Sequence, residues 1–312
     1  MKLLAAAPRA LTPLALLAAV LALIVPSQGV AGRSDLLLAA LVLATALGIA
    51  GSDLLELRRH ALAVTMLSIA PLIVLALVAW ALGQLFDVNT RDGLLAVGLS
   101  SSEVASVGLA ALAGADATIA LGAVTGSLVL AALVGPVTIG WLAGHAGHGG
   151  SSHLLVRFAL VVILPLIGGV TIRSAPVAAR WLRAHDAQRD GVAAVVVAVL
   201  VYAALSGTEG AHGLGSALVA SLAFLIVSTA LAALWQRGAG RDATAVPGAL
   251  AIAMRDFAVA AALASQAFGD RAAAVPGVYG VVMLLAGSAF VGLRTRRGSA
   301  DAPKPTGTPR RC

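Results

Sequence analysis

Long apolar runs separated by short polar segments make up most of this chain. A transmembrane α-helix needs about 17–25 predominantly apolar residues. Runs that meet or approach this length cover residues 11–30, 34–52, 61–86, 94–113, 117–143, 154–172, 191–206, 214–236, 246–268 and 273–293. The pattern predicts an all-α polytopic membrane protein with about ten transmembrane helices.

Composition supports lipid as the solvent. Of the 312 residues, 60% are hydrophobic and only 11% are charged, which is more apolar surface than a soluble domain of this size can bury. The 34 glycines suit closely packed membrane helices. Cys312 is the only cysteine, so an internal disulfide and a cysteine-based metal site are excluded. No cofactor and no metal site is expected.

The basic residues predict the orientation. With both termini placed in the cytoplasm, four of the 21 Lys and Arg residues fall outside: Arg33, Arg91, Arg157 and Arg271. Arg255 lies within a span, and the remaining sixteen fall inside. This is a strong positive-inside bias. It predicts a multi-pass protein of the plasma (inner) membrane, and it accounts for the net charge of +7 without a nucleic-acid partner.

The first span also resembles a secretory signal. Lys2 and Arg9 precede an apolar core, and "PSQGVAG" follows it. Cleavage is therefore an alternative, but it would leave nine spans and remove the symmetry of the two halves. We expect residues 1–30 to be retained.

A Gly/Ser/His-rich connector, residues 144–153, divides the spans into two sets of five. Because each set is odd in number, the second half would insert upside down relative to the first, and inverted repeats of this kind are typical of secondary transporters. We therefore predict a first five-helix repeat over 1–143 and a second over 154–293. Residues 294–312 are polar, basic and proline-containing, and they predict a disordered cytoplasmic tail.

The fourth span of each half carries charge near its middle. One reads "SSSEVASVGLAALAGAD" and the other "AMRDFAVAAALASQAFGD". In both, a run of small residues follows the charge and leads to a glycine and an aspartate, Gly114 with Asp116 and Gly269 with Asp270. Helices 4 and 9 are therefore predicted to be broken and to cross at the membrane midplane.

The candidate site lies at this crossing. An ionised group at the bilayer centre costs about 2.5–3.5 kcal/mol on insertion scales, so intramembrane charges are usually functional. Glu103, Arg255 and Asp256 are expected to face one another or a wet cavity, with the hydroxyls of Ser102 and Ser106 near the unwound backbone. Two carboxylates and one guanidinium leave a deficit of one positive charge, which a proton or a bound cation could supply. The alternative is that Arg255 only pairs with a carboxylate to hold two helices together.

Four segments resemble the bile acid–sodium symporter family over about residues 34–293. "GLLAVGLSSSEVASVGLAALAGADATIALGAVTGSLVLAALVGP" is similar to its fourth and fifth spans, and "AMRDFAVAAALASQAFGD" to its ninth. "VVILPLIGGVTIRSAP" is similar to its sixth span and "SIAPLIVLALVAWALGQLF" to its third. The resemblance implies a transporter in which spans 1, 2, 6 and 7 form a separate panel.

The chain departs from that family at its sodium ligands. Val107, Met66 and Ala251 stand where the family has polar side chains, and Arg255–Asp256 replace Gln–Asn. A hard cation needs oxygen ligands, which valine, methionine and alanine side chains do not supply. Sodium coupling is therefore doubtful. Arg255 is instead a candidate for a tethered cation that replaces the charge of the lost ion.

These observations predict a secondary active transporter, and not an enzyme, that moves a small organic solute by alternating access, and we expect this solute to be an organic anion. The partners implied are the solute and the lipid bilayer, and the coupling ion is a proton or sodium. Two alternatives stay open: a proton-coupled or uncoupled exporter of the same fold, and a degenerate family member that does not transport.

Overall fold

The computed structural model describes residues 11–49, 55–142, 150–206 and 213–300. Within these ranges the chain is helical apart from short connections and one isolated β-bridge, which confirms the all-α class. The elements are α2 (Leu11–Ile24), α3 (Gln28–Ala31), α4 (Ser34–Ala46), η2 (Arg58–His60), α6 (Ala61–Gly83), α7 (Val88–Leu99), α8 (Ala105–Leu112), α9 (Ala117–Leu142), α10 (Gly150–Ser174), α11 (Pro176–Ala184), α12 (Asp186–Ser206), α13 (Leu214–Ala239), α14 (Ala245–Ala253), α15 (Phe257–Phe268) and α16 (Asp270–Ala300).

Each predicted span coincides with a helix or with a pair of shorter helices. In the described part of the chain, α6, α9, α10, α12 and α13 are long and apolar enough to cross a membrane on their own. The fourth and ninth spans are each divided in two, into α7 with α8 and α14 with α15. The first two spans are shorter than predicted. Pro26 follows α2, and α4 ends at Ala46, just before Gly48.

The predicted boundaries between the parts of the chain fall partly outside the described residues. Of the predicted connector, residues 144–149 lie outside the described ranges, and residues 150–153 form the first turn of α10. At the other end, α16 continues to Ala300, so the first residues of the predicted tail are helical. Residues 1–10 and 301–312, which include Cys312, lie outside the described ranges.

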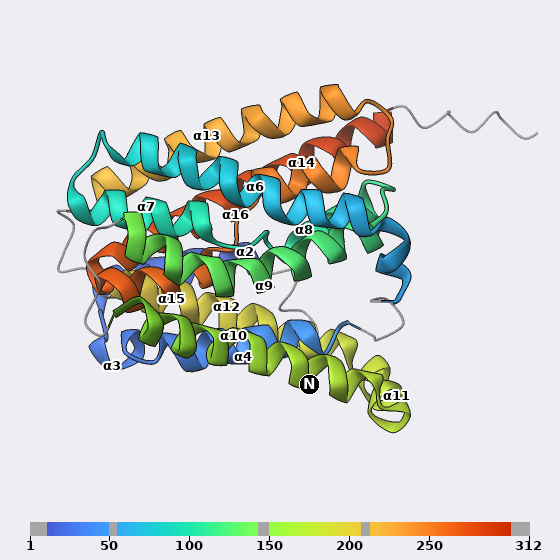
Figure 1. Ribbon diagram of the computed structural model, residues 1–312, viewed down its shortest axis with the longest axis horizontal. Helices are drawn as coiled ribbons and strands as arrows, with labels where there is room; N and C mark the ends of the chain where they lie inside the picture. The colour runs from blue at the N-terminus through green and yellow to red at the C-terminus, as the bar shows by residue number, and fades with distance from the viewer. Residues whose placement is uncertain (1–10, 50–54, 143–149, 207–212, 301–312) are drawn as a thin grey trace, which may run out of the picture.

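The helices pack in two groups. The panel bundle consists of α2, α3, α4, α10, α11 and α12, and the crossover bundle of α6 to α9 and α13 to α16. In Figure 1, α4, α10, α11 and α12 lie along the lower side of the molecule, and α6, α7, α13 and α14 along the upper side. The bundles meet where α12 packs on α16, α4 on α15 and α10 on α9. The panel bundle corresponds to spans 1, 2, 6 and 7.

Small residues let the helices of the crossover bundle approach closely. A Cβ atom added at Gly280 would lie 2.5 Å from the Phe257 ring, so only glycine lets α16 pack this tightly on α15. The side chains of residues 257–264 are all buried as a result. Such packing by small residues is the usual basis of helix association in membranes, and here it fixes the position of the second interrupted helix.

Candidate functional site

The two interrupted helices cross and pair with each other. Between α7 and α8, and between α14 and α15, the backbone is extended, and an antiparallel bridge joins Ser102 to Arg255. The Glu103 N–H donates to the Met254 carbonyl at 3.0 Å, and the Asp256 N–H donates to the Ser101 carbonyl at 2.8 Å. The predicted breaks and their crossing are therefore present, at the charged positions themselves.

Two hydroxyl groups complete the hydrogen bonding of the crossing. In this bridge the N–H groups of Ser102 and Arg255 point away from the partner segment. The Ser102 N–H donates to Ser127 Oγ on α9 at 3.0 Å, and the Arg255 N–H donates to the Tyr279 hydroxyl on α16 at 3.2 Å. Non-helical backbone is tolerated at membrane depth only where such partners exist. Ser127 and Tyr279 are thus required parts of the crossing.

Sequence reasoning missed both hydroxyls. Each lies on the helix that follows its crossing segment, and the separations are 25 residues from Ser102 to Ser127 and 24 from Arg255 to Tyr279. Tyr279 is also one of only two tyrosines in the chain and is fully buried. In both halves a hydroxyl residue follows the centre of the break by nearly the same number of residues, and this spacing could have been used to find both residues from the sequence.

Two of the charged residues complement helix ends. Asp256 is the N-cap of α15, where its Oδ1 accepts from the N–H groups of Ala258 and Val259 at 2.9 and 3.0 Å. Arg255 Nη2 donates to the carbonyl of Gly98 in the last turn of α7, at 3.4 Å. A carboxylate at a helix N-terminus and a cation at a helix C-terminus both interact favourably with the helix dipole. These two charges therefore stabilise the crossing itself.

Arg255 does not pair with a carboxylate. Its side chain is fully buried, and among the described residues it forms no ion pair; Nε and Nη1 have no hydrogen-bond partner there. Because side chains alternate along an extended segment, Arg255 and Ser102 lie on one face of the pair, and Glu103 and Asp256 on the other. The interpretation of Arg255 as a simple ion-pair clamp is not what this geometry shows.

Glu103 lies just before α8, and its carboxylate interacts with the N–H groups of Val104 and Ala105 at the start of that helix. Its Oε2 is buried without a hydrogen-bond partner among the described residues. Of the two predicted hydroxyls, Ser102 Oγ donates to the Ala251 carbonyl at 3.3 Å, whereas Ser106 is buried in the first turn of α8. A buried carboxylate oxygen without a donor is costly unless a proton or a cation reaches it. The crossing thus contains all five predicted residues, and among the described residues one oxygen of Glu103 and two nitrogens of Arg255 have no hydrogen-bond partner.

The Gly–Asp pairs end the two half-helices in the same way. Gly114 follows α8 with φ +71°, and Gly269 follows α15 with φ +93°, conformations that residues with a Cβ rarely adopt. Asp116 Oδ1 then accepts from the N–H groups of Thr118 and Ile119, at the start of α9, and Asp270 is the first residue of α16. The two similar Gly–Asp motifs in the sequence therefore have a similar structural role: in each, the glycine ends a half-helix and the aspartate begins the next span.

Met66 and Ala251 stand at two of the positions where the resemblance implies polar side chains, and neither side chain offers an oxygen. Met66 is half-exposed and lines an apolar cavity between α6, α13 and α14, together with Pro71, Trp235 and Ile252. Ala251 is buried, and its carbonyl accepts from Ser102. Within the described ranges, no group of three His, Cys, Asp or Glu side chains could hold a metal ion.

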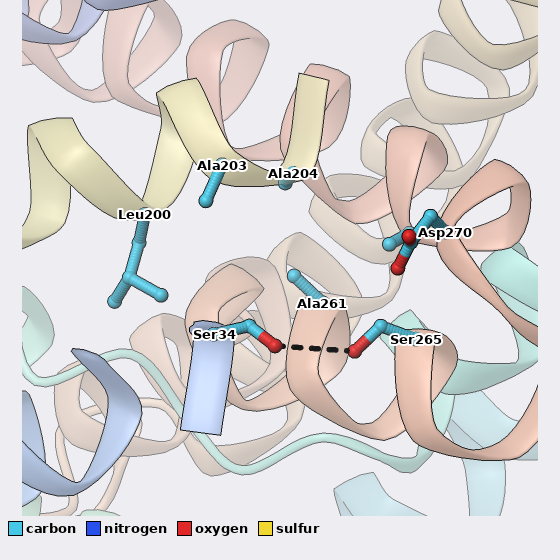
Figure 2. A pocket seen from close by; sticks show the side chains of 8 residues that line it. Ser34, Leu200, Ala203, Ala204, Ala261, Ser265 and Asp270 are labelled. Carbon is cyan, nitrogen blue, oxygen red and sulfur yellow. Dashed lines mark hydrogen bonds between the residues drawn. The ribbon is translucent and has the colours of Figure 1, made fainter. Parts of the chain in front are cut away.

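Polar contacts join the two bundles at the ends of α4 and α15. Gln266 Nε2 donates to Asp35 Oδ1 at 2.6 Å, and Arg157 Nε donates to Asp35 Oδ2 at 2.8 Å. The hydroxyls of Ser34 and Ser265 lie 3.5 Å apart. Figure 2 shows these two serines facing each other beside a small cavity, with Ala261 and Leu200 at its walls. Arg157 and Asp35 both belong to the panel bundle, so we call only the Gln266–Asp35 and Ser34–Ser265 contacts the interbundle contact; they lie at the predicted outer end of the spans.

An all-helical, apolar chain with two interrupted helices that cross at buried charges defines a polytopic membrane protein of the transporter class. The model of the SBF-like CPA transporter family (DUF4137) matches residues 11–285, and the chain belongs to this family. The match supports the resemblance to bile acid–sodium symporters and a general transport function. No curated protein matches the sequence significantly.

Proposed function

We propose that this protein is a secondary active transporter of a small organic anion that works by alternating access, with Ser102, Glu103, Ser106, Arg255 and Asp256 forming the substrate and coupling site. The observation that carries the proposal is the crossing: a fully buried guanidinium with two unpartnered nitrogens lies on one face, and a carboxylate oxygen without a donor on the other. Buried polar groups of this kind are expected to be satisfied by what the site binds.

The charges suggest how the solute and the coupling ion depend on each other. Glu103, Asp256 and Arg255 together carry one excess negative charge when all are ionised. This excess negative charge would repel an anionic solute. A proton or a cation bound at Glu103 would neutralise the excess charge. Arg255 supplies a fixed positive charge and unused donors, and the N-termini of α8 and α15 face the same crossing. Uptake of one positive charge before or with the anion is the coupling that we infer.

The apolar replacements favour a proton over sodium. Met66 faces an apolar cavity, and the Ala251 carbonyl already accepts from Ser102. A sodium site would have to be built from the remaining carbonyls and hydroxyls alone. The interbundle contact supports alternating access, because it joins the two bundles by a few polar contacts that can break and re-form.

The test measures the apparent melting temperature of the purified protein in detergent, in sodium and in potassium at equal ionic strength, from pH 5 to pH 8. A ligand that binds only the folded state raises this temperature. We expect no difference between the two cations, and a pH dependence that the Glu103→Gln variant loses. The matched control is Glu56→Gln, which removes an exposed carboxylate and should leave the pH dependence unchanged.

A second arm tests transport itself. Proteoliposomes that contain the protein should accumulate or release protons when a library of organic anions is added under an imposed pH gradient, and Glu103→Gln should abolish this movement. A sodium-specific rise in melting temperature would refute the proton coupling. Absence of any anion-dependent flux, with the folded protein shown by gel filtration, would favour the degenerate, non-transporting alternative.

A further inference from the structure

The short helix α11 carries an exposed apolar face that no helix of the described ranges covers. Val177 is 74% exposed and Trp181 is 62% exposed, and the two lie four residues apart, so they share a face of the helix. Leu182, on another face, is buried against the protein. In Figure 1, α11 lies at one end of the molecule, just beyond the end of α10. This position matches the level at which membrane spans meet the headgroups.

The arginines of α11 differ from those beside it. Arg173 and Arg189 both form ion pairs with Asp186, at 3.6 and 3.0 Å. Arg180 and Arg183 are exposed, and within the described ranges neither forms an ion pair. They lie three residues apart, on a face adjacent to that of Val177 and Trp181. The helix therefore presents two unpaired positive charges beside an exposed apolar face.

The Trp181 ring is held in place. It stacks on the His185 ring, with centroids 4.4 Å apart, and the His185 Nδ1 atom lies 2.8 Å from the Trp181 carbonyl oxygen. Pro176 begins α11 directly after α10, which limits how far the helix can move from the end of that span. A large aromatic side chain fixed in an exposed position, next to free cations, is suited to an interface and not to water.

We propose that α11 is a binding site for anionic phospholipid. Val177 and Trp181 enter the boundary between headgroups and acyl chains, and Arg180 and Arg183 bind the phosphate groups. An interfacial amphipathic helix binds in this way, through apolar area together with attraction to anionic lipid. The site lies on the panel bundle, so bound lipid would tie this bundle to the membrane surface, independently of what the crossover bundle transports.

The test uses Trp181 as a local reporter in the full-length protein. Trp80, Trp141 and Trp235 are replaced by Phe, and the variant is reconstituted in mixed phosphatidylcholine and phosphatidylglycerol vesicles in which one lipid or the other is brominated. Bromine quenches tryptophan fluorescence only on close approach. We expect brominated phosphatidylglycerol to quench Trp181 more strongly at equal mole fraction, with an apparent preference of roughly fivefold for each arginine.

Three controls define the result. Arg180→Gln with Arg183→Gln should abolish the preference, whereas Arg237→Gln with Arg241→Gln, two exposed arginines at the end of α13 and just after it, should leave it unchanged. A variant that retains only Trp80, which is 46% exposed on α6, should be quenched equally by both lipids. If the triple Trp→Phe variant does not fold, the difference between wild type and Trp181→Phe gives the same signal. Equal quenching of Trp181 by the two lipids, or none by either, would overturn the proposal.

Discussion

The two interrupted helices share a backbone plan but differ in their surroundings. In each, a half-helix ends, an extended segment crosses, a hydroxyl from the following span accepts its free N–H, and a glycine with positive φ ends the second half-helix. Yet residues 257–264 of α15 are all buried, whereas Leu112 of α8 is 79% exposed. Similar backbones therefore carry a fixed helix in one half and a loosely packed one in the other.

The N-termini of α8 and α15 differ too, and again α15 is the more firmly held of the two. Asp256 caps α15 with two hydrogen bonds, but Val104 at the N-cap of α8 offers no side-chain acceptor. Arg255, from the well-packed half, also reaches across to the carbonyl of Gly98 in the other half. The second half thus stabilises the first, and Glu103 lies beside α8, the more exposed of the two half-helices.

The largest effect is expected when the link between the halves is removed. Arg255→Ala deletes a fully buried side chain and its bond to the Gly98 carbonyl, and it should lower the free energy of unfolding by about 2 kcal/mol, the size of a hydrogen bond from a charged donor. Thermal or denaturant unfolding in detergent measures the loss. Arg33→Ala, which removes an exposed arginine, should change stability by less than about 0.5 kcal/mol. Equal effects of the two variants would show that Arg255 does not join the halves.

An intermediate effect is expected at the two hydroxyls. Ser127→Ala and Tyr279→Phe each leave one backbone N–H of the crossing without its acceptor, and each should cost about 1 kcal/mol. Ser228→Ala is the control, because this buried hydroxyl bonds only within its own helix. The same unfolding measurement applies. A loss for Tyr279→Phe without one for Ser127→Ala would mean that the two N–H groups are not equivalent and would break the comparison.

The smallest effect is expected at Asp87, the N-cap of α7, which lies outside the predicted spans. Burial raises the pKa of the Asp87 carboxyl, but hydrogen bonds from the Thr90 hydroxyl and from the N–H groups of Thr90 and Asn89 outweigh it, so this pKa lies below its usual value of 3.8. Because the pKa of Asp87 is lower in the folded than in the unfolded protein, its ionised carboxylate stabilises the fold at pH values above the unfolded pKa. This stabilisation is lost as the pH falls through the folded-state pKa.

Asp87→Asn keeps the cap but removes the charge, so it should cost only about 0.3 kcal/mol at pH 7. Melting temperatures of wild type and variant should converge as the pH is lowered below about 4. A difference that grows toward acid pH would contradict this sign. Asp256 is an N-cap of the same type but lies buried inside the crossing. Comparing the stability loss of Asp87→Asn with that of Asp256→Asn therefore measures how much burial changes the contribution of such a cap.

The sequence was sufficient to locate the spans and both breaks, because intramembrane charges and Gly–Asp turns leave strong marks in an apolar chain. It was not sufficient to find the partners of the charges. Arg255 binds a main-chain carbonyl, and carbonyls carry no sequence signal. The difference between α8 and α15 was equally hidden, since helices rich in alanine and valine are apolar on every face and show no periodicity that tells buried from exposed. The inverted-repeat topology remains a prediction.

The interbundle contact also sets an energy scale. Gln266 donates to Asp35, and the hydroxyls of Ser34 and Ser265 meet beside this bond. Each such hydrogen bond contributes about 0.5–1.5 kcal/mol net, so the two together bias this end of the molecule toward closure by about five- to 150-fold. Under the proposed alternating access, a bias of this size would keep the empty protein closed at this end most of the time, and the binding energy of an ordinary small ligand would be enough to reverse it. In such a cycle the contact would be strong enough to prevent a leak and weak enough to let the bundles separate.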